Sequence, residues 1–321
     1  MALVQAGLRG LAEGALMAAL CVVLGLSAYY IPVLGVAAVL VGPVPIVVAC
    51  LRHGPRIAIL AAVVAGILLG AFLGAMQGLV MGFGFGSMGL ALGMGFSRQA
   101  PPFTTVLWGS LAVASASTLS LGLGFLFLHI SPVQTIEQMF QAYESASELW
   151  GRLGAAGMQE QARTMVAMMR QSFALLWPAA FAGAFVMAAA INWAVARAIL
   201  RRLGYRVPDP APFAQWRVPR WLLIPFLLAW AAMAAASYYR LDWLYRLGTN
   251  VNMLLMLVMA VEGAAVAFGF LRRWFGGRAG LVLAGIVIMI PGLAWPLIVW
   301  LGVFDLLFDY RRLANPAPGR G

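Results

Sequence analysis

The sequence predicts an all-α, polytopic integral membrane protein with eight or nine transmembrane helices, and two observations lead to that fold class. Of the 321 residues, 63% are hydrophobic and only 10% are charged, whereas a soluble domain carries about 25% charged residues. The hydrophobic residues also gather in long runs, and about 20 such residues suffice to cross a hydrocarbon layer about 30 Å thick. We therefore expect the lipid bilayer to surround most of the chain.

The apolar runs define nine expected segments. No charge occurs from Ile57 to Ser97, so this run is expected to hold two crossings joined by a turn at Gly74–Gly78. Prolines interrupt the second segment at Pro43 and the last one at Pro291 and Pro296, and such breaks require protein or water to satisfy the freed carbonyls. The segments are 10–30, 33–51, 57–76, 78–97, 103–129, 172–197, 221–239, 250–271 and 279–304.

The arginines predict how the chain threads through the membrane. If the N-terminus lies in the cytoplasm of a bacterium, the inside loops hold thirteen arginines and two acids, and the outside connections hold five of each, as the positive-inside rule requires. We attribute the net charge of +11 to these loops and expect no nucleic-acid partner. Nine crossings would leave Arg311, Arg312 and Arg320 outside, so either the rule fails at the tail or the last segment does not cross fully.

The same pattern predicts the domain organisation. Six segments fall in residues 1–200, together with an insertion at 131–171. In this insertion the apolar residues recur at helical spacing on one side, and the acidic residues lie on another. We expect this insertion to form one or two amphipathic helices on the outer membrane surface. A cytoplasmic linker rich in proline and arginine, 201–220, precedes a C-terminal membrane segment, 221–313.

The glycines of the fourth segment favour helix packing over nucleotide binding. The stretch GFGSMG (84–89) matches the dinucleotide fingerprint, but its flanks are uninterrupted apolar residues and not the strand and helix which that motif needs. Glycines instead recur every three or four residues along one face of a helix, where they allow a close neighbouring helix or form the wall of a small cavity. They are Gly78, Gly82, Gly86, Gly89 and Gly93.

The first segment carries two similar stripes of small residues. Gly10, Gly14 and Ala18 form one, and Leu11, Ala15 and Ala19 form the other. Either stripe suits helix contact within the protein or docking of a second membrane protein.

The N-terminal sequence also resembles a known class of transport protein. The stretches EGALMAALCVVLGLSAYYIPVLG and GPVPIVVACLRHGPRIAILAAVVAGILLG are similar to the start of the substrate-binding S components of energy-coupling-factor (ECF) transporters. Over its full length, including the closing FDLLFDYRRL, the chain resembles the YybS-like family of bacterial polytopic membrane proteins. The resemblance implies an S-component-like bundle of the first six segments, with Ala15 and Ala19 facing a membrane coupling subunit that works with separate ATPases.

Four polar residues are candidates for binding a small-molecule ligand. Tyr29, Tyr30, Gln77 and His129 all fall at the outer ends of segments in the topology above, and a few polar groups in an apolar pocket are typical of binding sites. The alternative is that the tyrosines belong to the interfacial aromatic belt, while Gln77 lies in a turn and His129 at a solvated helix end.

Glu262 stands near the middle of an expected span, where a charge costs at least about 2.5–3.5 kcal/mol. It must be protonated, paired across helices or facing water. We interpret it either as part of a proton or cation relay, with Asn192 as the candidate partner, or as a neutral acid bonded to a backbone carbonyl.

No enzyme class fits these residues. A Walker A loop needs a lysine, and the chain has none; no H-E-x-x-H motif occurs, and Ser87 is expected too far from His129 for a catalytic pair. We expect no enzyme activity, no cofactor and no metal. The sequence therefore predicts a multi-pass protein of the bacterial cytoplasmic membrane that binds a small solute, with or without taking it up; the alternative is a scaffold or regulator that acts through helix–helix contacts.

Overall fold

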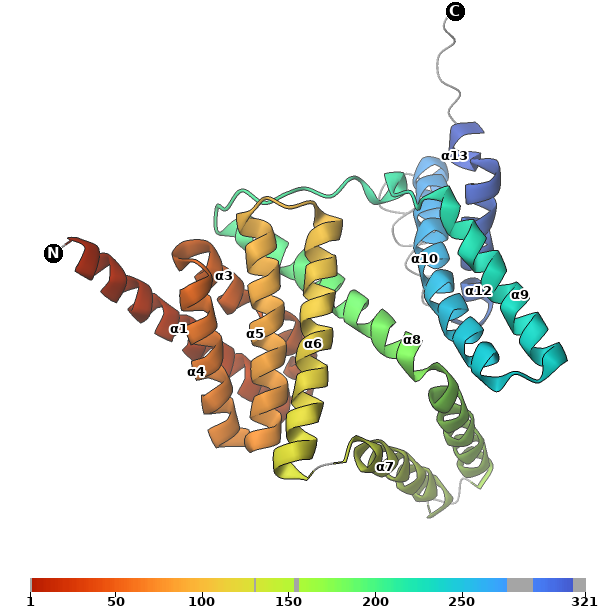
Figure 1. Ribbon diagram of the computed structural model, residues 1–321, viewed down its shortest axis with the longest axis horizontal. Helices are drawn as coiled ribbons and strands as arrows, with labels where there is room; N and C mark the ends of the chain where they lie inside the picture. The colour runs from red at the N-terminus through yellow and green to blue at the C-terminus, as the bar shows by residue number, and fades with distance from the viewer. Residues whose placement is uncertain (1, 130, 153–155, 276–290, 314–321) are drawn as a thin grey trace, which may run out of the picture. The chain divides into compact units, whose positions relative to one another are not determined.

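The computed structural model describes residues 2–129, 131–152, 156–275 and 291–313. Throughout these residues the elements are α-helices and two short 3-10 turns, without a β-strand (Figure 1). Seven of the described helices are long and apolar enough to cross a membrane, and two apolar stretches, Ala37–His53 and Trp295–Phe308, are shorter. The expected fold class, an all-α polytopic membrane protein, is confirmed; the expected last segment, 279–304, lies partly outside the described residues.

The chain folds into two compact units. The first comprises residues 1–168 and 184–209, and the second comprises residues 169–183 and 210–321. Helix α8 contributes to both units. The division at 209/210 falls inside the expected linker, 201–220, and residues 169–183 also belong to the second unit.

The first unit is built on seven helices and on the beginning and the end of an eighth. Their bounds are α1 (Ala2–Tyr30), α2 (Pro32–Val41), α3 (Val44–His53), α4 (Pro55–Leu73), α5 (Ala75–Ser97), α6 (Pro102–Leu128), α7 (Pro132–Arg152) and α8 (Ala156–Arg202). Gly14 packs against Ile57 and Gly25 against Leu69, so α1 and α4 run in parallel.

Prolines and glycines set the helix boundaries of this unit. Pro43 stands between α2 and α3, which explains the break in the second expected segment, because proline lacks the N–H that would continue the helix. Gly54 and Gly74 adopt φ values of +83° and +94°, which glycine reaches without strain. The predicted turn between the two charge-free crossings thus lies at Gly74, and α5 begins with the next residue.

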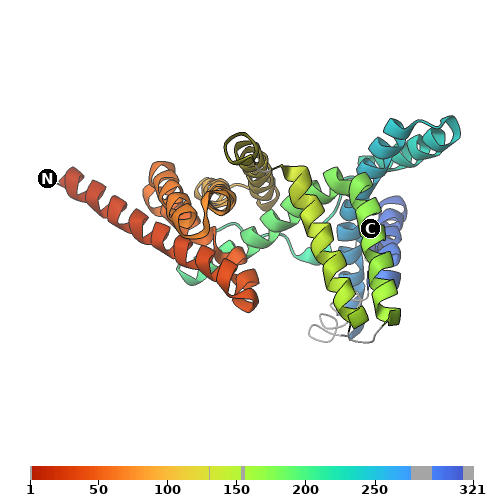
Figure 2. The same ribbon diagram turned by 90° about the horizontal axis from the view of Figure 1, so that it is seen from below.

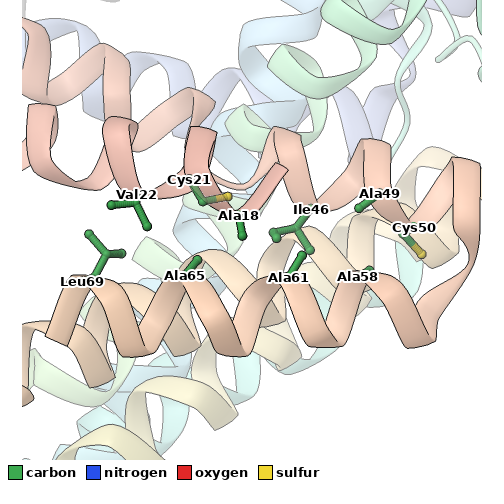
Figure 3. Close-up of a cluster of buried hydrophobic side chains, with 10 residues drawn as sticks. All are labelled: Ala18, Cys21, Val22, Ile46, Ala49, Cys50, Ala58, Ala61, Ala65 and Leu69. Atoms are coloured by element: carbon green, nitrogen blue, oxygen red, sulfur yellow. The ribbon is translucent and has the colours of Figure 1, made fainter. Parts of the chain in front are cut away.

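Small side chains fill the core between α1, α3 and α4 (Figure 3). Ala18 and Cys21 of α1 point toward Ala61 and Ala65 of α4, with Ile46 of α3 beside them. A second cluster joins α3 and α5 to the end of α8, where the Phe96 and Trp193 rings stack with centroids 6.2 Å apart. Both cysteines are free and buried.

Two helices cover the insertion at 131–171, for which one or two amphipathic helices were expected. Helix α7 covers its first half, but residues from 156 onward already belong to α8, which runs to Arg202 with Pro178 inside it. Figures 1 and 2 show α7 and the beginning of α8 side by side, and Glu148 of α7 lies 4.0 Å from Arg163 of α8. The amphipathic insertion is therefore a helical hairpin whose second arm extends into the sixth expected span.

The second unit contains the linker end and the C-terminal helices. These are the 3-10 turns Phe213–Gln215 and Arg220–Leu222, then α9 (Leu223–Tyr239), α10 (Asp242–Phe275), α12 (Pro291–Phe308) and α13 (Tyr310–Leu313). The linker that the structure shows is therefore 203–222. Pro296 lies inside α12 and does not end it, in contrast to the expected interruption.

Candidate functional site

The buried carboxylate of Glu262 is the starting point of the candidate site. It lies on α10, its side chain is 1% exposed, and it forms an ion pair with Arg311 of α13. The backbone N–H of Val218, in the linker, donates to the other carboxylate oxygen over 2.7 Å. Of the three possibilities for Glu262, the structure shows pairing across helices, with a partner 49 residues away in the sequence.

Arg311 joins the C-terminal segment to the linker. Its guanidinium donates to Asp305 Oδ2 over 2.8 and 3.0 Å. It also donates to the backbone carbonyls of Ala214, over 3.1 Å, and Trp216, over 2.6 Å. Burial lowers the pKa of Arg311 from its usual value, and the positive charge of Arg217 lowers it further, but a guanidinium keeps its proton at any physiological pH.

A second layer of ion pairs lies at the rim of the same contact. Asp309 accepts from Arg217 over 3.1 Å and from Arg220 over 3.1 Å. We call the whole set the charged cluster: Glu262, Asp305, Asp309, Arg217, Arg220 and Arg311. Three carboxylates face three guanidinium groups, so the cluster can be neutral as a whole without protonation of any member.

The paired charges of this cluster stabilise the contact between the C-terminal helices and the linker. Buried ions cost several kcal/mol each to desolvate, and pairing with good hydrogen bonds offsets that cost. Each carboxylate has at least one guanidinium partner; in addition, the Val218 N–H donates to Glu262, and the Ala214 and Trp216 carbonyls accept from Arg311. Among the described residues, no three His, Cys, Asp or Glu side chains are placed to hold a metal ion.

A second polar contact in this unit repairs a break in α8. Pro178 lies inside that helix, so the carbonyl of Ala174 loses its helical N–H donor. Arg246 of α10 donates to this carbonyl over 3.4 Å. The amide of Asn250 bridges the next rung: its Nδ2 donates to the Leu175 carbonyl over 2.9 Å, and its Oδ1 accepts from the Ala179 N–H over 3.0 Å. The side chain of Asn250 thus replaces one helical hydrogen bond.

Asn192, the candidate relay partner of Glu262, belongs to the other unit. It is buried on α8, and its Nδ2 donates to the Ala188 carbonyl over 2.9 Å. Its Oδ1 is buried and accepts no hydrogen bond from the described residues. The structure thus provides Glu262 with partners of its own and leaves Asn192 with a spare acceptor.

The four candidate ligand residues lie at one end of the first unit. Tyr29 and Tyr30 close α1, Gln77 lies in the first turn of α5, and His129 caps α6. Met76 packs against Gly124, which brings the start of α5 beside the end of α6. The tyrosine rings meet edge to face with centroids 5.2 Å apart; both tyrosines and His129 are exposed, and Gln77 is half-buried.

The glycine stripe of α5 faces its neighbouring helices. A Cβ on Gly82 would lie 2.5 Å from the Gly66 Cα, and Gly78 meets Gly70 in the same way. Further along, Gly86 faces α4, whereas Gly89 and Gly93 face α3. The structure places the stripe in close contact with other helices over its whole length.

The two stripes of α1 have different surroundings. Gly10, Gly14 and Ala18 are buried; Gly10 and Gly14 pack against His53 and Ile57. Leu11, Ala15 and Ala19 are exposed on the adjacent face, about 100° round the helix. The first unit therefore covers one stripe and leaves the other uncovered.

Sequence reasoning missed Arg311 and Asn250. Arg311 did give a signal, since the tail arginines were the exception to the positive-inside rule, and Asp305 and Asp309 precede them in the sequence. Asn250 gave a weaker one: a proline break in α8 requires a polar partner, and Asn250 is an amide inside an otherwise apolar span.

These features define the class of protein: an all-α polytopic membrane protein whose units are held by small-residue packing and a buried charged cluster. Within that class, the chain belongs to the family described as "Predicted membrane protein (DUF2232)", whose model matches residues 19–306. It is 23% identical over 308 residues to the "Uncharacterized protein YybS" of Bacillus subtilis (strain 168), covering 95% of this chain and 98% of that one. The expected YybS-like membership is confirmed. No solved structure matches.

Proposed function

We propose that this protein binds a small solute from outside the cell, in the manner of the S component of an ECF transporter, and hands it to a membrane partner. In this proposal the protein lies in the bacterial cytoplasmic membrane with its N-terminus inside. It is not an enzyme; separate ATPases, reached through a coupling subunit, supply the energy.

The observation that carries the proposal is the division of α1 into two small-residue faces. The face of Gly10, Gly14 and Ala18 is used up in packing against α3 and α4. The face of Leu11, Ala15 and Ala19 is exposed, although small residues contribute little to contact with lipid and allow close helix approach. This is the face that the resemblance assigns to the coupling subunit.

The solute would bind at the opposite end of α1. Tyr29, Tyr30, Gln77 and His129 lie at helix ends on that side, where donors, acceptors and aromatic faces can select a ligand. The buried acceptor of Asn192 is a further polar group inside the same unit.

A thermal-shift experiment on the detergent-purified protein tests solute binding. The probes are riboflavin, thiamine, biotin, Co²⁺ and Ni²⁺. We expect at least one probe to raise the Tm. Gln77→Ala and His129→Ala should each weaken the affinity for that probe about tenfold, a loss of about 1.4 kcal/mol in binding free energy, and so reduce the Tm shift. Gln141→Ala, at an exposed position of α7, is the control and should respond like the wild type.

The alternative, a membrane scaffold or regulator, rests on the same uncovered face of α1. If no probe shifts the Tm and a membrane protein co-purifies in a way that Ala15→Leu abolishes, the scaffold is favoured and solute binding is rejected. Loss of co-purification in Ala15→Leu together with an intact solute response supports the proposal in both parts.

A further inference from the structure

The charged cluster joins two parts of the second unit that are far apart in the sequence. The linker contributes Arg217, Arg220 and three backbone groups, and the segment after α12 contributes Asp309 and Arg311. Direct hydrogen bonds of 2.6–3.4 Å connect these parts, so both must lie at the same level of the membrane.

The helices of this unit are consistent with such a placement. Helix α9 leads away from the linker, and Gly248 near the start of α10 packs against Met233 of α9, so α10 returns beside it. Near the end of α10, Phe268 contacts Phe213 of the linker, with ring centroids 5.8 Å apart. Both α10 and α12 therefore end on the linker side.

We propose that the segment Asp305–Arg311 is a strap that closes on the linker and fixes α13 on the same side of the membrane as residues 210–222. An even number of crossings then separates the linker from the tail. If the linker is cytoplasmic, Arg311 and Arg312 are cytoplasmic as well, and the apparent exception to the positive-inside rule disappears.

The strap also has a consequence for dynamics. The linker segment 213–220 contains few buried apolar side chains, and such segments open locally at low free energy unless other contacts hold them. Here the holding contacts are ionic: Arg311 binds two linker carbonyls, and Asp309 binds two linker arginines. Weakening the ion pairs of Asp309 with Arg217 and Arg220 should therefore release the linker without unfolding the helices.

Cysteine labelling in intact and permeabilised cells tests the placement. The full chain first receives Cys21→Ala and Cys50→Ala, and then one of three single substitutions: Gln215→Cys in the linker, Gly321→Cys at the terminus, or Tyr239→Cys at the exposed far end of α9. A membrane-impermeant maleimide should label Gln215→Cys and Gly321→Cys from one side and Tyr239→Cys from the other. Labelling of Gly321→Cys together with Tyr239→Cys, but not Gln215→Cys, would overturn the strap. This comparison holds for either orientation of the protein, and it does not depend on solute binding.

Limited trypsin digestion of the purified protein tests the strap itself. We expect Asp309→Asn to speed cleavage after Arg217 and Arg220 about fivefold, the effect of losing roughly 1 kcal/mol of local stability. Asp209→Asn is the matched control, because Asp209 also accepts from two arginines, Arg197 and Arg201, but outside the strap. Unchanged cleavage in Asp309→Asn, or the same increase at Arg217 in both variants, contradicts the strap; an unchanged Tm in Asp309→Asn excludes general unfolding as the cause.

Discussion

The two units of the protein solve the same packing problem with different chemistry. In the first unit, α4 and α5 run side by side without one charged residue from Ile57 to Ser97, and glycine meets glycine between them. In the second unit, α10 and α12 also approach closely, with Gly263 against the Ile298 carbonyl and Gly302 against the Met259 carbonyl. Three carboxylates and three arginines are added at one end of that contact.

The difference shows what each kind of contact is suited to. Lipid gives helices no hydrophobic reason to associate, so close van der Waals contact along small residues holds neighbouring spans together. A linker at the end of a span has few apolar side chains to pack, and directional ion pairs with backbone hydrogen bonds hold it instead. The chain has only ten acidic residues, and three of them belong to this single cluster.

Removal of Glu262 should have the largest effect on stability. Glu262→Ala leaves the guanidinium of Arg311, 13% exposed, without one of its two carboxylate partners, and breaking a buried pair costs about 3–5 kcal/mol. We expect a corresponding loss in the free energy of unfolding in detergent micelles, partly restored in Glu262→Ala/Arg311→Ala. Glu160→Ala, at an exposed position, should stay within about 0.5 kcal/mol of the wild type. If Glu262→Ala left the free energy of unfolding unchanged, the ionic contact would not hold the second unit.

A methyl group on the glycine stripe tests the contrasting contact in the first unit. In Gly82→Ala the new Cβ would lie 2.5 Å from the Gly66 Cα, and backbone cannot move aside as a side chain can, so we expect a loss of about 1–3 kcal/mol. Gly84 lies on the same helix with open space around it, and Gly84→Ala should gain up to about 1 kcal/mol from helix propensity. Thermal unfolding of the two variants provides the comparison, and equal Tm values would argue against close helix contact.

A double-mutant cycle tests whether Asn250 replaces the hydrogen bond opened at Pro178. Asn250→Ala leaves the Ala179 N–H and the Leu175 carbonyl without their partner, a cost of about 1–3 kcal/mol for a buried group. In a Pro178→Ala background the helix can close this rung itself, so the same substitution should cost about 1 kcal/mol less. Unfolding free energies of the four proteins give the coupling; additive effects would show that the amide and the proline act separately.

The smallest expected effect compares how the two units end a span. His129 closes α6 and Arg240 closes α9, each with φ of 55°, a left-handed conformation that costs a non-glycine residue about 1–2 kcal/mol. Both side chains are exposed, so His129→Gly and Arg240→Gly should each raise the unfolding free energy by up to about 1 kcal/mol. A loss of stability in His129→Gly alone would show that its imidazole makes a contact that Arg240 does not.

The sequence predicted the helices well because each is set by local features. Apolar runs located the spans, Pro43 located the break between α2 and α3, and Gly74 located the turn before α5. It failed at α8, where the change from polar to apolar residues indicated a new segment at 172. The structure shows one helix from 156 to 202, and Pro178 is tolerated inside it because α10 supplies the missing partners.

The pairing of charges lay beyond the sequence for a different reason. Glu262 had no cation within two turns along the chain, and its partner Arg311 comes from another helix. Contacts of this kind depend on how the helices pack, and neither the periodicity nor the composition of the sequence determines that packing. What the sequence did give was the cost of a lone carboxylate in an apolar span, which was enough to state that a partner must exist.

The length of α8 has a practical consequence. Its 47 residues extend about 70 Å at 1.5 Å per residue, more than twice the thickness of a bilayer's hydrocarbon core. One crossing needs less than half of that length, so the polar start of α8, which pairs with the amphipathic α7 through Glu148 and Arg163, is left for the membrane surface. An antibody fragment raised against this surface hairpin would add mass to a 34.3 kDa particle, and so help to open this family to electron cryo-microscopy.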